Sequence, residues 1–130
     1  MLLGTYGAFG AEVDVSDRIV LTVPAGARFR GVATLVLGGI GGRAALSYER
    51  MDDLQLAVLS ILDSTDGEAV TLEVESDDGG LAVAIGPVRD GSSNDDGLRL
   101  VLSRLVEGVA HEHRDGAEWI TFGVANGSAA

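Results

Sequence analysis

The pattern of apolar and polar positions first predicts a short strand. Apolar residues alternate with others over residues 19–23, and Pro24 interrupts the run, as is typical of a half-buried strand. The same alternation returns on either side of two turn-forming sequences, 77–80 and Asp115-Gly116, and Gly86-Pro87 is expected to end one of the runs. It predicts two hairpins, whose strands cover residues 70–74, 81–85, 110–114 and 118–124.

Three other stretches carry apolar residues at the spacing of one face of an α-helix. The first runs from Phe29 to Ile40 and is expected to stop at the glycines 41–42. Ser47 can cap the second, which is expected to end within residues 63–67. The third is the most regular stripe, formed by Leu98, Val101, Leu102, Leu105, Val106 and Val109. Glycines inside the first stripe indicate either close packing or a marginal helix; they are Gly31, Gly38 and Gly39.

The resulting order is β, α, α, β, β, α, β, β. It predicts an α+β fold, a two-layer sandwich with three helices packed on one face of a mostly antiparallel mixed sheet of about five strands. We expect residues 1–16 to form a flexible N-terminal arm, residues 17–125 a single domain, and residues 126–130 a tail.

Composition narrows the functions open to the chain. Its 130 residues carry a formal net charge of -11, because twenty acids outnumber nine arginines and lysine is absent. A nucleic-acid-binding face needs cations to neutralise phosphates, so that function is not expected, and neither is binding to an anionic membrane. The absence of cysteine excludes disulfides and thiolate chemistry. With no basic leader and no long apolar span, we expect a cytoplasmic protein.

Four segments, in this order and spacing, carry a family resemblance. They are residues 51–58 at the start of the second helix, the strand 81–85, the helix start 97–102, and the closing hairpin 115–122. Together they resemble the anti-sigma regulatory factor and serine-protein kinase branch of the Bergerat-fold (GHKL, histidine-kinase-like) ATPases, especially compact actinobacterial members. The resemblance covers roughly residues 18–124 and implies the histidine-kinase-like ATPase fold.

The resemblance also places the family's catalytic positions on this chain. Active members carry a general-base Glu and a magnesium-binding Asn on the second helix, and those positions fall at Ser60 and Ser64. A hydroxyl is a poor general base without a partner and a weak magnesium ligand. The adenine-binding Asp has no counterpart at Gly86-Pro87, and Asp90-Gly91 lies three or four residues late, where it is more typical of a turn.

The second glycine motif of the family survives only in part. Gly97 and Leu98 remain, but Arg99 stands where the second glycine would be. Asp95 and Asp96 stand directly before the helix, where carboxylates repel a phosphate and one of them can cap the helix. The sequence therefore indicates a degenerate nucleotide site.

The resemblance, with these losses, implies a non-catalytic regulator of the anti-sigma factor type, a pseudo-ATPase that acts by binding protein. Its implied partners are a sigma factor, a STAS-type antagonist or a second copy in a homodimer, and no cofactor is expected. One alternative is an active ATP-dependent serine-protein kinase with rearranged site residues, which would need ATP and magnesium, with Asp90 reading adenine. Another is a structural dimerisation domain without a signalling role.

Three further features have both a chemical and a plain structural interpretation. His111 and His113 share one strand face and could bind a metal with Glu118, although a solvated strand face is the favoured interpretation. Trp119, the sole tryptophan, is expected to face away from the helices, either as an interface anchor or as a half-exposed strand residue. Ser92 lies in a polar loop without the sequence context of a hydrolase nucleophile.

Overall fold

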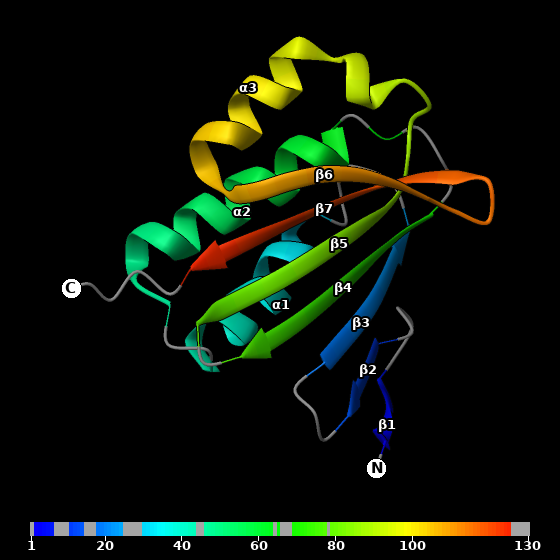
Figure 1. Ribbon diagram of the computed structural model, residues 1–130. Coiled ribbons are helices and arrows are strands. Elements are labelled where there is room, and N and C mark those ends of the chain that lie inside the picture. Colours follow the sequence, from blue (N-terminus) through cyan, green and yellow to red (C-terminus); the bar gives the residue numbers. More distant parts are fainter. Residues whose placement is uncertain are drawn as a thin grey trace.

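In the computed structural model, the described residues are 2–6, 11–14, 18–24, 30–43, 46–63, 65, 69–77 and 79–125. The expected tail, residues 126–130, lies outside them. Within them the chain forms seven strands and three α-helices, arranged as one sheet with helices behind it (Figure 1). The two-layer α+β arrangement expected from the sequence is confirmed.

The sheet has the strand order β1-β2-β3-β4-β5-β7-β6, and neighbouring strands pair antiparallel throughout. Its strands are β1 (Leu2–Tyr6), β2 (Ala11–Asp14), β3 (Arg18–Pro24), β4 (Ala69–Asp77), β5 (Gly80–Val88), β6 (Glu107–Arg114) and β7 (Ala117–Ala125). The five predicted strands are β3 to β7. The segment expected as an arm, residues 1–16, contributes β1 and β2, which extend the sheet beyond β3 and which the sequence pattern did not reveal.

The helices are α1 (Arg30–Arg43), α2 (Tyr48–Asp63) and α3 (Asp96–Leu105). They cover one face of the sheet, and α2 packs against both other helices as well as β5 and β7 (Figure 1). The predicted cap of α2 is confirmed, because the backbone N–H of Arg50 donates to the Ser47 hydroxyl over 3.2 Å. The most deeply buried side chains of α2 are Leu54, Val58 and Ile61.

The core lies between the two layers. Alternate residues of the central strands point toward the helices, so Ile85 and Ile120 are fully buried against Leu54 and Leu102 of the helical layer. The hairpin turn at Asp115-Gly116 is confirmed, and both residues have positive φ, 51° and 81°, as a two-residue turn requires. Among the described elements, no helix lies on the other face of the sheet (Figure 1).

Three predicted boundaries are wrong, those of α1, β5 and α3. Helix α1 continues through Gly41, where an added Cβ would lie 2.0 Å from Met51 Cε, so this glycine permits close contact with α2. Close packing therefore occurs at Gly41, while Gly31 and Gly39 have open space. Strand β5 passes through Pro87 to Val88, because the register shift against β7 is a place where proline is tolerated.

Helix α3 ends at Leu105, earlier than its apolar stripe suggests. Val106 already has extended backbone, with φ -136° and ψ 175°, and Val109 belongs to β6. Val106 and Val109 nevertheless pack on the same core as the helix. Val106 and Val109 match the helical spacing of α3 only by coincidence, because they follow the helix and also face the core.

Candidate functional site

At the start of α3, a side chain of the preceding loop accepts a hydrogen bond from the first turn of the helix. Asp95 is the N-cap residue, and its Oδ1 accepts a hydrogen bond from the backbone N–H of Leu98 over 3.0 Å. This confirms the capping expected for one of the two aspartates. Asp96 occupies the first turn, and Gly97 and Leu98 follow it, so two carboxylates surround the donors that a phosphate would need. Arg89, whose Nη2 lies 3.9 Å from Asp95 Oδ2, also binds this cap.

The second helix places a hydroxyl where the resemblance requires a general base. Ser60 lies on α2, and its Oγ donates to the carbonyl of Leu56 over 2.8 Å. A serine bonded to its own helix in this way has its proton directed at a backbone carbonyl. Ser64, the other position that the resemblance implies, lies outside the described residues.

The loop between β5 and α3 is anchored at its centre. Asp90 is exposed, and Gly91 has φ 87°, a left-handed conformation that favours glycine. Ser92 opens a short 3-10 helix, η3 (Ser92–Asn94), with its side chain buried. Its hydroxyl donates to the carboxylate of Glu118 on β7, which is also buried. Asp90 thus points into solvent on a loop that a buried hydrogen bond holds to the sheet.

Sequence reasoning missed this pair, although one signal was present. Glu118 alternates along β7 in step with Ile120, Phe122 and Val124, so its side chain lies on the strand face that points toward the helices. This alternation alone predicts a carboxylate inside the protein, and a buried carboxylate needs a hydrogen-bond donor. Ser92 supplies that donor.

The two histidines lie on one face of β6, as expected. In the register of the hairpin, His111 is opposite Ile120 and His113 is opposite Glu118. The Nε2 of His111 is buried without a hydrogen-bond partner, while His113 is exposed. Among the residues that the structure describes, no three His, Asp or Glu side chains converge in a way that could hold a metal ion.

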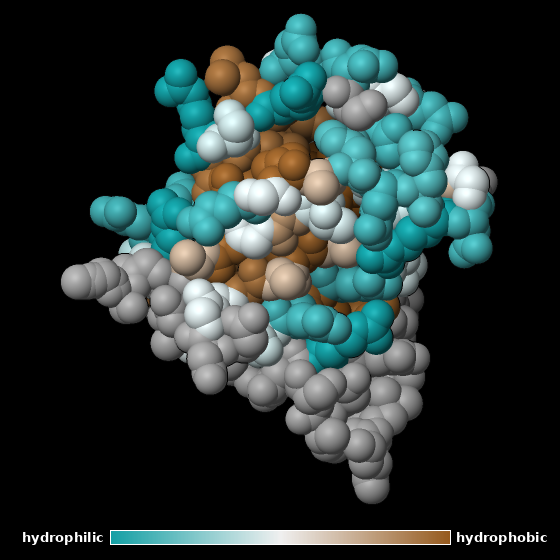
Figure 2. Space-filling view, viewed as in Figure 1, coloured by the Kyte–Doolittle hydropathy of each residue, from teal (hydrophilic) through white to brown (hydrophobic). Residues whose placement is uncertain are grey.

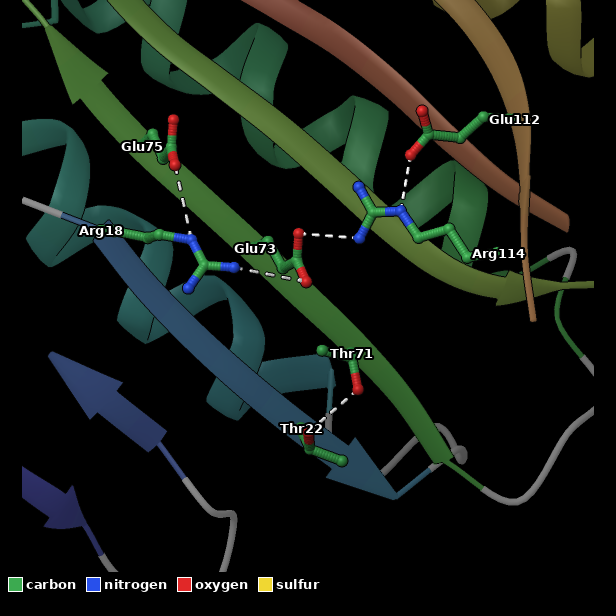
Figure 3. Close-up of polar contacts among 7 residues, drawn as sticks. All are labelled: Arg18, Thr22, Thr71, Glu73, Glu75, Glu112 and Arg114. Atoms are coloured by element: carbon green, nitrogen blue, oxygen red, sulfur yellow. Dashed lines mark hydrogen bonds and ion pairs between the residues drawn. The ribbon is translucent and has the colours of Figure 1, made fainter. Parts of the chain in front are cut away.

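The open face of the sheet carries a network of charged side chains (Figure 3). Arg18 contacts Glu73 over 3.6 Å and Glu75 over 3.4 Å. Arg114 contacts Glu73 over 2.9 Å and Glu112 over 2.6 Å, so Glu73 lies between two guanidinium groups. A hydrogen bond to Glu73 is the main cause that raises the pKa of Arg114 above its ordinary range, and a hydrogen bond to Glu112 is the second cause. The network joins β3, β4 and β6, and the contact between Arg114 and Glu73 spans the two intervening strands, β5 and β7.

Trp119 lies on this open face, as the alternation of β7 predicts. Its ring packs against the backbone at Gly86, where an added Cβ would lie 2.4 Å from Trp119 Cδ2. The guanidinium carbon of Arg114 lies 4.3 Å from the ring centroid, in a cation–π arrangement. Trp119 is thereby half-buried between a glycine and an arginine, which fixes its orientation on the sheet.

Comparison with known proteins does not identify a family. No protein-family model matches the chain, and no curated protein is significantly similar to it. Within the described part of the chain, no helix combines the length and apolar character needed to cross a membrane.

Proposed function

We propose that this chain is a non-catalytic regulator of the anti-sigma factor type, which acts by binding another protein and retains only a degenerate nucleotide site. The observation that carries this proposal is the cap of α3. A helix start that binds phosphate must offer backbone N–H groups to it. Here the N–H of Leu98 is bonded to Asp95, and Asp96 adds a second negative charge beside it.

Two further observations support the loss of catalysis. The hydroxyl of Ser60 is bonded within its own helix, and no acidic side chain stands at that position. The loop carrying Asp90 is tied to β7 through Ser92 and Glu118. Asp90 is exposed on this anchored loop, three or four residues beyond the position that the resemblance assigns to the adenine-binding Asp.

The kind of partner follows from charge and from the resemblance. The α+β arrangement of three helices on one antiparallel sheet is compatible with the fold that the resemblance implies, and this supports the proposal. In that family the partners are sigma factors, STAS-type antagonists or a second copy. The net charge of -11 favours a partner with a basic surface, because long-range attraction steers oppositely charged proteins together.

The test is binding of ATP and ADP with magnesium, measured by calorimetry and by thermal shift on one sample. We expect no heat of binding and no shift relative to magnesium alone. A site with a Kd near 100 µM would stabilise the protein by about 1.4 kcal/mol at 1 mM nucleotide. Such a shift would overturn the proposal and favour the ATP-dependent kinase, for which Asp90→Ala should then abolish binding.

A further inference from the structure

The open face of the sheet is hollowed along β5 and β7. A groove of about 720 Å³ lies there, and its floor is formed by the small residues Ala82, Ala84, Thr121 and Gly123. Longer side chains of β3, β4 and β6 form its walls. From this side, apolar and neutral side chains occupy the middle of the face and hydrophilic ones lie on both sides (Figure 2). We call this groove the trough.

At Gly123 the floor of the trough has no side chain, although the described residues leave room for one. A Cβ added at Gly123 would meet the carbonyl oxygens of Leu81 at 3.6 Å and Glu107 at 3.9 Å, which are ordinary contacts. The φ of Gly123 is also outside the left-handed region. Glycine weakens a strand interior, and where it persists it often marks the close approach of another backbone. Gly86 differs, because the Trp119 ring occupies the space above it.

The walls of the trough are acidic overall. Three carboxylates line it, those of Glu73, Glu75 and Glu107, against the two cations Arg18 and Arg114. Both arginines already contact carboxylates of the same face, and Glu75 and Glu107 remain exposed. A second copy of this chain would bring the same excess of acid and a net charge of -11. Charge therefore favours a cationic occupant over self-association.

The dimensions of the trough suit one secondary structure. Its walls stand on β4 and β6, which are three strand spacings apart in the order β4-β5-β7-β6. At about 4.8 Å per spacing this is about 14 Å between strand axes. An α-helix with its side chains is about 10–12 Å across, so one helix fits between Glu75 and Glu107. It ends where the contact between Arg114 and Glu73 joins the two walls across the floor.

We propose that the trough binds one α-helix of a partner protein, with small or apolar residues toward the floor and Lys or Arg along both flanks. This inference rests on the proposed regulatory function and assigns its binding surface. The helix would lie over Ala82 and Gly123, and its cations would meet Glu75 and Glu107. Helix-in-groove recognition of this kind draws affinity from the buried face and register from the flanking charges.

The test uses a stapled helical peptide of about 18 residues, with an alanine and leucine face and lysine flanks, which spans about 27 Å. Binding is followed by amide chemical shifts and by the fluorescence of Trp119. We expect the shifts to cluster at residues 82–84 and 121–123, and the affinity to fall as salt rises. A peptide with glutamate in place of every lysine should not bind.

Variants separate the trough from general attraction to an acidic protein. Ala82→Arg fills an exposed part of the floor and adds a cation, so it should weaken binding by at least about ten-fold. Glu107→Lys reverses an exposed wall charge without filling the floor, so it should weaken binding too. Leu56→Arg adds the same charge on α2, at a position that is 52% exposed, and should leave affinity unchanged.

Three results would overturn the inference. Shifts that map to another surface, or equal affinity of Ala82→Arg and Leu56→Arg, would mean that the peptide does not occupy the trough. A dimer of the free protein that Ala82→Arg dissociates would make a second copy the occupant. If the native protein does not bind the peptide, the trough does not bind a cationic helix. None of these bears on nucleotide binding, so the proposed function would stand or fall separately.

Discussion

Ser92 donates a hydrogen bond to Glu118 inside the protein, although the two residues are 26 positions apart and belong to a loop and a strand. Only 1% of Ser92 and 5% of Glu118 is exposed. A buried carboxylate is costly unless donors satisfy it, so this contact links the stability of β7 to the conformation of the loop before α3.

Replacing Ser92 with alanine should destabilise the protein by about 1–3 kcal/mol, because the Glu118 carboxylate would lose a buried donor. Urea unfolding followed by Trp119 fluorescence measures the change. Ser103→Ala is the matched control, since that hydroxyl is exposed and bonds only to Leu100 of its own helix. Equal stability of the two variants would mean that the buried bond contributes nothing.

Removing the cap of α3 should also cost stability. Asp95→Ala removes the acceptor for the Leu98 N–H and should destabilise the protein by about 0.5–2 kcal/mol. Asp90→Ala removes an exposed carboxylate of the same loop and should change stability by less than about 0.5 kcal/mol. Thermal unfolding of both variants checks this prediction. A larger loss from Asp90→Ala would contradict the assignment of Asp95 as the cap.

Gly86 should be intolerant of any side chain. Gly86→Ala places a methyl group within the Trp119 ring and should destabilise the protein by about 1–3 kcal/mol. Gly123→Ala is the control on the neighbouring strand, where a methyl group has room; it should be neutral or stabilise by up to about 1 kcal/mol. In a protein that already carries Trp119→Ala, Gly86→Ala should destabilise the fold less than it does in the native protein. A double-mutant cycle measures this coupling.

The contribution of Arg114 should persist at alkaline pH. Its pKa is raised in the folded protein, so its contribution is complete below the ordinary arginine pKa and is lost only as pH rises through the higher folded value. The ordinary pKa of lysine is about 10.4, and the same carboxylates would raise it in the folded Arg114→Lys protein, so the contribution of this cation should be complete below about pH 10.4 and fall above it. Chemical unfolding at about pH 7 and about pH 11.5 measures this, with native protein as control. An unchanged difference between the two proteins would contradict the role of this charge.

Local patterns predicted the helices and the five strands from β3 to β7 because each of these buries one face. A buried face imposes a period of two or 3.6 residues on the sequence itself. The caps at Ser47 and Asp95 and the turn at Asp115-Gly116 were predictable for the same reason. Each of these depends on residues within four positions along the chain.

The boundaries failed where distant residues decided them. Gly41 stays within α1 because Met51 packs there, and Val109 belongs to β6 although its spacing continues the stripe of α3. The short strands β1 and β2 were not predicted, since apolar and polar residues do not alternate in β1 and β2 has only four residues.

In the candidate site, too, features of single positions were predictable from the sequence and contacts between distant residues were not. The sequence indicated that Ser60 replaces a catalytic acid and that aspartates precede Gly97, because these are properties of single positions. It could not indicate that Ser92 anchors the loop to Glu118, or that Glu73 lies between Arg18 and Arg114. Both depend on β5 pairing with β7 and not with β6.

By itself, then, the sequence determined the kinds of elements, their order, the acidic charge and the residues missing from a nucleotide site. Only the tertiary structure decided which face of the sheet stays open and which small residues form the floor of the trough between Glu75 and Glu107. The physical reason is that periodicity records whether a side chain is buried, whereas strand order sets which side chains meet. Strand order arises from pairing between segments that the local pattern does not connect.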